Sequence, residues 1–162
     1  MQEKSFSLTL IPIHLSSNEL AFTNYVYISV SNYSTLVQAN QMKKPVYISI
    51  KASVFIAEAD QKVGENQIAI GRFPRTYLKL SLEDPIAVSL YRCERNILLR
   101  QLVVEVVLGK SLIDKRLEVE DDALEKSIRH SFKSQFLNAG QTLAINYENN
   151  ILILNILESS NI

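Results

Sequence analysis

The sequence predicts a mainly β protein with a smaller α/β lobe at its C-terminal end. Apolar residues alternate with polar ones through much of the first half of the chain, which is typical of half-buried strands. Only one segment, residues 118–137, has apolar residues at helical spacing. Two further apolar runs follow at residues 142–147 and 151–156. Together these observations predict a β-rich first lobe and a second lobe of one helix and several strands.

The first lobe, residues 1–91, is expected to hold six or seven short strands and no helix. Its apolar runs are separated by residues that favour turns, such as Gly64, Gly71 and Pro85. A barrel suits so many short strands better than an open sheet does, because closure leaves no unpaired edge. The expected strands are Phe6 to Leu10, Val26 to Val30, Val46 to Ile50, and residues 67–70 and 86–91.

The second lobe is expected at residues 96–162, after a charged linker at residues 92–95. It begins with an apolar strand at residues 97–108 and continues with the helix, in which every fourth residue of one face is apolar. The sequence Glu148-Asn149-Asn150 joins the two final strands as the turn of a hairpin would. Since the chain ends shortly after an apolar strand, we expect this α/β lobe to be incomplete.

Composition excludes several classes of protein. The 162 residues are 47% hydrophobic and carry 17 basic and 17 acidic side chains, so no overall charge attracts nucleic acid or an anionic membrane. The most apolar stretch, residues 97–108, is too short and too often interrupted by polar residues to cross a membrane. A single cysteine, Cys93, and an N-terminus unlike a signal peptide favour the cytoplasm. We therefore expect a cytoplasmic protein that neither inserts into membranes nor binds nucleic acid.

No catalytic, cofactor or metal site is expected in this chain. Gly109-Lys110-Ser111 resembles the end of a phosphate-binding loop, but Val104 stands where that loop needs a glycine. Cys93, His14 and His130 are too widely scattered to match the ligand spacing of a zinc site. The chain is therefore expected not to be an enzyme.

Basic residues interleaved with aromatic ones form the remaining candidate site. Arginine beside an aromatic ring suits an acidic protein surface or a nucleic acid, because the guanidinium group pairs with carboxylates or phosphates and stacks on rings. An ordinary solvated face of a strand and loop has the same composition, so the pattern by itself leaves these alternatives open. The residues are Arg72, Phe73, Arg75, Tyr77 and Lys79, followed further on by Lys110, Lys115 and Arg116.

Three segments, taken in their order and spacing, resemble a known family. They are Asn18-Glu19-Leu20-Ala21-Phe22-Thr23-Asn24, Ser81-Leu82-Glu83-Asp84-Pro85-Ile86-Ala87-Val88-Ser89-Leu90-Tyr91, and Gln135-Phe136-Leu137-Asn138-Ala139-Gly140-Gln141-Thr142-Leu143. Together they resemble the N-terminal domain of the N-ethylmaleimide-sensitive factor, a vesicle-fusing ATPase of the AAA+ class. The resemblance runs, with gaps, over residues 18–158.

The resemblance implies a double-psi β-barrel followed by an α/β roll, and a role in vesicle-mediated protein transport. Such a domain docks the ATPase onto SNAP adaptors, which hold the SNARE complex that the ATPase rings then disassemble. ATP and magnesium would belong to those rings, which lie outside this chain. This fragment would then be a monomer, its parent a homohexamer, and the protein would reach membranes only through its adaptors.

The resemblance also implies which residues meet the adaptor. By position, Arg75 and Lys110 match two basic residues of the family's adaptor surface, and His14 stands where a further arginine is expected. Thr76 and Ser111 depart from the family, which has basic residues at these positions. Two alternatives stay open: the N-terminal domain of another AAA+ ATPase that recruits ubiquitin-pathway adaptors, and a nucleic-acid-binding barrel. Further candidates for the adaptor surface are Arg72, Lys79, Lys115 and Arg116.

Overall fold

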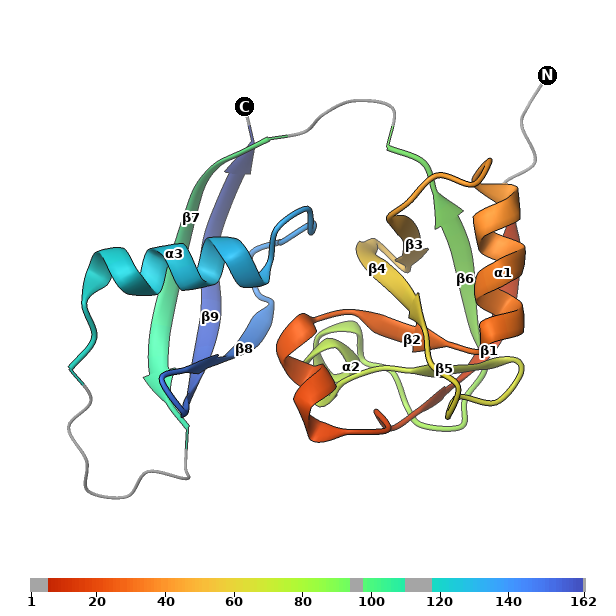
Figure 1. Cartoon of the computed structure of the whole chain (residues 1–162), viewed down its shortest axis with the longest axis horizontal. Coiled ribbons are helices and arrows are strands. Elements are labelled where there is room, and N and C mark those ends of the chain that lie inside the picture. Colours follow the sequence, from red (N-terminus) through yellow and green to blue (C-terminus); the bar gives the residue numbers. More distant parts are fainter. Residues whose placement is uncertain (1–5, 94–97, 110–117, 162) are drawn as a thin grey trace. The chain divides into compact units, whose positions relative to one another are not determined.

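A computed structural model of the chain describes residues 6–93, 98–109 and 118–161. The chain divides into two compact units, Met1–Asn96 and Ile97–Ile162. Unit 1 contains a closed β-barrel, and unit 2 contains a three-stranded sheet with one helix (Figure 1). The expectation of a mainly β protein with a barrel and a smaller α/β part is confirmed at this level.

Six strands close the barrel of unit 1 in the order β1-β5-β2-β4-β3-β6. Two pairs of neighbours are parallel, β1 with β5 and β2 with β4, and the other four pairs are antiparallel. Closure means that each of these strands has a hydrogen-bonded neighbour on both sides. The strands are β1 (Ser7–Ile13), β2 (Val26–Ile28), β3 (Val46–Ile50), β4 (Ser53–Ala59), β5 (Gln67–Ala69) and β6 (Ile86–Tyr91).

The barrel consists of two equivalent halves whose strands alternate around the ring. One half holds β1, β2 and β3, and the other holds β4, β5 and β6. Exchanging β1 with β4, β2 with β5 and β3 with β6 reproduces the same order and the same parallel and antiparallel pairs. Each half also carries a helix between its second and third strands. Every ladder of the barrel therefore joins a strand of one half to a strand of the other.

Helical elements occupy three connections of unit 1, so the expectation of an all-β first lobe without a helix is wrong. The N-cap of the first α-helix is Ser29, whose hydroxyl accepts a hydrogen bond from the N–H of Asn32. Only Leu36 and Val37 among its apolar residues are buried, so its apolar face is too narrow to show as a helical period. The elements are η1 (Asn18–Thr23), α1 (Val30–Ala39) and α2 (Arg72–Leu78).

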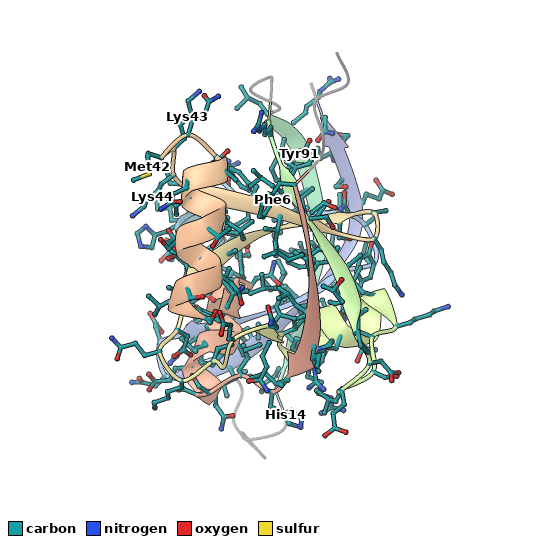
Figure 2. The ribbon with its side chains drawn as sticks, turned by 90° about the vertical axis from the view of Figure 1, so that its right-hand side faces the viewer. Phe6, His14, Met42, Lys43, Lys44 and Tyr91 are labelled. Atoms are coloured by element: carbon teal, nitrogen blue, oxygen red, sulfur yellow. The ribbon has the colours of Figure 1, made fainter. Side chains whose placement is uncertain are left out.

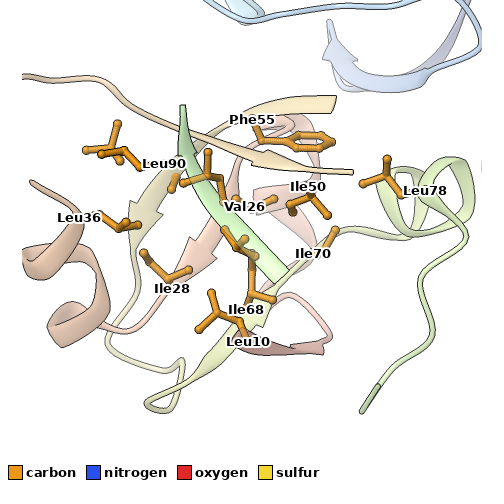
Figure 3. Packing of buried hydrophobic residues seen from close by; sticks show 14 of the residues in the cluster. Leu10, Val26, Ile28, Leu36, Ile50, Phe55, Ile68, Ile70, Leu78 and Leu90 are labelled. Atoms are coloured by element: carbon orange, nitrogen blue, oxygen red, sulfur yellow. The ribbon is translucent and has the colours of Figure 1, made fainter. Parts of the chain in front are cut away.

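The barrel core contains side chains from all six strands and from both α-helices. Leu36 of α1 and Leu78 of α2 enter the cluster from opposite sides (Figure 3). Their exposed fractions are only 1% and 6%. Burying one leucine contributes about 1.5–3 kcal/mol, whereas helices this short are marginal alone in water. Packing onto the barrel therefore stabilises both helices.

Unit 2 is an antiparallel sheet in the order β7-β9-β8, with α3 packed on one face. The helix is shorter than the expected segment 118–137, because it begins at Asp121 and ends at Ser131. The expected hairpin is confirmed. Its turn residues Glu148 and Asn149 have φ angles of 48° and 62°, as a type I′ turn requires. The elements are β7 (Leu99–Leu108), α3 (Asp121–Ser131), β8 (Thr142–Tyr147) and β9 (Asn150–Asn161).

Candidate functional site

The helix α2 carries several of the basic residues that the sequence singled out. Gly71, just after β5, is its N-cap, and Pro74 is its third residue. Proline is tolerated in the first turn of a helix, because an N–H at that place has no partner within the helix. The segment is therefore helical rather than a strand and loop, which changes the side chains that share a surface.

One face of α2 is basic. Arg72 and Arg75 lie three residues apart on one side of the helix, and Lys79 directly follows its last residue, Leu78. Arg72 and Lys79 are exposed, and their side chains form no ion pair or hydrogen bond with the residues that the structure describes. Leu78 points into the barrel core. Leu78 thus holds α2 on the barrel, and the charged groups of Arg72 and Lys79 face the solvent.

His14 joins this surface, although it is 61 residues away from Arg75 in the sequence. The parallel pairing of β1 with β5 places Ile13 opposite Ala69, so both strands end at the same side of the barrel. Nη2 of Arg75 lies 3.4 Å from Nδ1 of His14. A guanidinium group can only donate, so in this contact Nδ1 accepts. We call the following residues the α2 basic face: His14, Arg72, Arg75 and Lys79.

Arg75 is the most constrained residue of the α2 basic face. Its side chain is half-buried, and its Nε atom is buried without a hydrogen-bond partner among the described residues. A buried donor left unpaired costs about 1–3 kcal/mol and is uncommon in folded proteins. The base of the guanidinium group is thus fixed by packing, and Nη2 on its outer side faces His14. This partly desolvated arginine is suited to binding an anionic group.

The end of α2 fixes the position of Lys79. Lys79 has a left-handed backbone with φ 54°, and its N–H donates to the carbonyl of Thr76 at 3.2 Å. The N–H of Leu80 donates to the carbonyl of Arg75 at 2.9 Å. These two hydrogen bonds define a Schellman motif, in which the residue after the left-handed one usually packs on the helix. Leu80 does so, against the barrel core, and Lys79 is therefore held on a well-ordered turn.

Lys51 is a further cation beside α2 that sequence reasoning missed. It follows β3, and its ammonium group donates a hydrogen bond to the carbonyl of Leu78, the last residue of α2. A cation at this place complements the negative end of the helix. No local pattern in the sequence connects Lys51 with α2, because only closure of the barrel brings β3 to this helix.

Three predicted adaptor-binding residues, Lys110, Lys115 and Arg116, lie outside the described residues. Their relation to the α2 basic face therefore stays a prediction. Within the described ranges, no three His, Cys, Asp or Glu side chains come together as metal ligands. The described helices also include none long and apolar enough to cross a bilayer.

The arrangement of the α2 basic face suits an extended acidic surface. Arg72 begins α2 and Lys79 directly follows it, so the two lie near opposite ends of a helix about 10 Å long. Arginine pairs with carboxylates through parallel N–H donors, and lysine adds a more mobile point charge. The face can therefore bind several carboxylates of one partner at the same time.

The segments that carry the family resemblance do not include α2. The first forms η1 and the left-handed residue Asn24, and the second forms the loop after α2 together with β6. The third connects α3 with β8. No protein-family model matches the sequence, and no curated protein is significantly similar to it.

Proposed function

We propose that the chain is the adaptor-binding N-terminal module of a vesicle-fusing AAA+ ATPase. In this proposal the α2 basic face binds acidic residues of a SNAP adaptor that holds a SNARE complex. The observation that carries it is the 3.4 Å contact between Arg75 and His14. The resemblance implied both residues separately, as basic positions of one adaptor surface. Their meeting on one surface supports that assignment.

The same proposal assigns a finer fold to each unit. The barrel would be a double-psi barrel, supported by the alternation of two equivalent halves with one helix in each. Unit 2 would belong to an α/β roll, supported by its antiparallel sheet with α3 on one face. The module would contain no catalytic residue. ATP and magnesium would bind in hexameric rings of the parent protein, in the cytoplasm.

Charge pairing would provide the binding energy of the α2 basic face. An exposed ion pair contributes only about 0.2–1 kcal/mol, so useful affinity needs several pairs formed together. Arg72 and Lys79 are available for such pairs, and Arg75 supplies a partly desolvated charge between them. The affinity should fall as salt is added, because exposed charges are screened.

Calorimetry with a purified SNAP adaptor tests the proposal. The combined change of Arg72→Glu and Lys79→Glu reverses two exposed charges and removes no side-chain hydrogen bond or ion pair within the described residues. We expect binding at least about tenfold weaker, since two ion pairs become repulsive contacts. The matched control is Lys126→Glu with Lys133→Glu, which makes the same change of net charge on exposed residues of unit 2. The control should bind like the wild type.

Equal affinity of the wild type and the α2 variant for the adaptor would contradict the proposal, and so would a wild type that does not bind the adaptor. If the wild type instead retains a ubiquitin-pathway adaptor, the chain belongs to another AAA+ ATPase. Strongly salt-dependent binding of single-stranded DNA, lost in the α2 variant, would assign the α2 basic face to nucleic acid.

A further inference from the structure

A second basic surface lies where α1 ends, and it displays an apolar residue. Met42 is 70% exposed, more than any other large hydrophobic residue that the structure describes. Lys43 and Lys44 follow it directly and are also exposed. Figure 2 shows the three side chains together at one end of α1, with His14 near the opposite end of the view. This surface is therefore separate from the α2 basic face.

The loop that presents Met42 is held by hydrogen bonds. The N–H of Met42 donates to the carbonyl of Val37 at 2.8 Å, and Nδ2 of Asn40 donates to the carbonyl of Lys43 at 2.9 Å. Gln41 and Met42 both have left-handed backbones, with φ angles of 56° and 60°. Non-glycine residues adopt this conformation at a cost of about 1–2 kcal/mol each. The loop thus holds Met42 in one position at some cost to stability.

Exposure of Met42 is not a property of the turn in which it lies. The end of α1 has the same two hydrogen bonds as the Schellman motif at the end of α2. In that motif the residue that follows the first left-handed one normally packs back on the helix. Leu80, which holds this position in the other half of the barrel, packs against the core. Met42 holds the same position and faces the solvent.

The cations around Met42 are partly fixed by neighbouring groups. Nζ of Lys44 lies 5.9 Å from the ring centroid of Tyr33, a cation–π distance. Nη2 of Arg92 donates to the carbonyl of Ala39 at 3.0 Å. Neither lysine forms an ion pair with the residues that the structure describes. Their positive charge is therefore available to a partner.

We propose that this surface is a docking site for an acidic segment of a partner protein, whose apolar side chain packs on Met42. The charge of the surface selects an acidic partner, and the exposed thioether selects one with an apolar residue among its carboxylates. Methionine is enriched at protein interfaces relative to the rest of the surface. A loop held in one conformation also loses little entropy on binding. The α1-end patch consists of Met42, Lys43 and Lys44.

A membrane surface fits the α1-end patch less well than a protein does. Even a myristoyl chain gives only marginal membrane binding, and one methionine buries far less apolar area than that chain. Each cation near an anionic membrane adds about 1 kcal/mol. Lys43 and Lys44 with Met42 would give a weak and diffuse attraction. The contact of Lys44 with Tyr33 instead gives its ammonium group a preferred position, which suits directed pairing with a carboxylate.

Titration of the full chain with a synthetic peptide, followed by NMR, tests this proposal. The peptide has three glutamates on each side of a single leucine, and a second peptide has alanine in place of the leucine. We expect the leucine peptide to shift the amide signals of the α1-end patch. Lys43→Glu with Lys44→Glu should weaken binding at least about tenfold, and Met42→Ala about fivefold. Met42→Leu should bind like the wild type.

A double-mutant cycle tests whether Met42 contacts the leucine of the peptide. Because the two side chains are proposed to touch, replacing both by alanine should cost less than the sum of the single changes. Equal binding of the two peptides, or shifts centred elsewhere, would overturn the proposal. Binding to vesicles with 30% phosphatidylserine but not to the peptide would also overturn it. The Arg72→Glu/Lys79→Glu variant should keep these shifts, which separates this surface from the α2 basic face.

Discussion

Lys51 lies just after β3, yet its ammonium group donates a hydrogen bond to the main-chain carbonyl of Leu78, the last residue of α2. The other half of the barrel repeats this relationship. Arg92 lies just after β6 and donates to the carbonyl of Ala39, the last residue of α1. A cation from each half therefore caps the helix of the other half, in keeping with the exchange symmetry of the strands.

Replacing Lys51 by methionine should destabilise unit 1. The change keeps most of the side-chain volume but removes the hydrogen bond to the end of α2, so we expect a loss of about 1 kcal/mol. Urea denaturation followed by circular dichroism measures this loss. Lys43→Met is the matched control, because Lys43 is exposed and its side chain makes no contact of this kind among the described residues. Equal stability of the two variants would show that the cap contributes nothing.

Replacing Asn32 by alanine should cost about 2 kcal/mol of stability, because it breaks a buried network. Oδ1 of Asn32 accepts hydrogen bonds from Oγ of Ser29 at 2.8 Å and from the N–H of Asn66 at 2.9 Å. The side chain thus ties the start of α1 to the turn before β5. Chemical denaturation gives the difference, with the exposed Ser34→Ala as a control that should lose little. A loss no larger than that of the control would contradict this role.

The carboxyl group of Asp60 should titrate at a lower pH than an ordinary aspartate. A hydrogen bond from Ser16 at 2.6 Å and one from the N–H of Lys62 at 2.9 Å lower its pKa from 3.8. The folded state binds this proton less readily than the unfolded state. The contribution to stability is therefore complete above pH 3.8 and is lost as the pH falls through the folded-state pKa.

Carbon-detected NMR titration of Asp60 measures this pKa directly. Ser16→Ala removes the hydrogen bond that lowers the pKa of Asp60 most, so the pKa should move up toward 3.8. A distant change such as Ser34→Ala should leave it where it is in the wild type. An unchanged pKa in Ser16→Ala would mean that the hydroxyl does not stabilise the ionised carboxylate.

Glycine at position 41 should stabilise the protein, because Gln41 has a left-handed backbone with φ 56°. Glycine adopts this conformation without the clash that a Cβ atom causes. We expect a gain of about 0.5–1 kcal/mol in thermal or chemical denaturation. Gln38→Gly, at an exposed position in the last turn of α1, should instead lose up to about 1 kcal/mol. A loss in both variants would contradict the left-handed assignment.

Strands were predictable where one face is buried and the other only half-buried, as in β3, whose residues alternate along Val46–Ile50. β4 escaped prediction, because Phe55, Ile56 and Ala57 are consecutive buried residues and interrupt the alternation. The helix α1 escaped because it contains no charged residue and several β-branched ones, which have low helix propensity. Its stability comes from packing on strands that are distant in sequence.

The basic residues of α2 were recognisable by type, but their common surface was not. The spacing of Arg72, Arg75 and Lys79 is helical, and it was the one local signal that could have revealed this face. The approach of His14 depends on the register of β1 with β5, which no local pattern specifies. Their role in adaptor binding stays a prediction.

Alternation of the two halves around the barrel also constrains the order in which the chain can fold. No barrel ladder can form within the first half alone, because each ladder needs a strand from residue 53 onward. The earliest available pairing is the hairpin of β3 and β4, where Ile50 faces Ser53 across the boundary between the halves. β1 cannot pair with another strand before β5, which begins at Gln67, has been synthesised. During synthesis, we expect the first half to remain without a barrel ladder until the second half begins to leave the ribosome. Barrel folding should then be slow and cooperative, as non-local pairing requires.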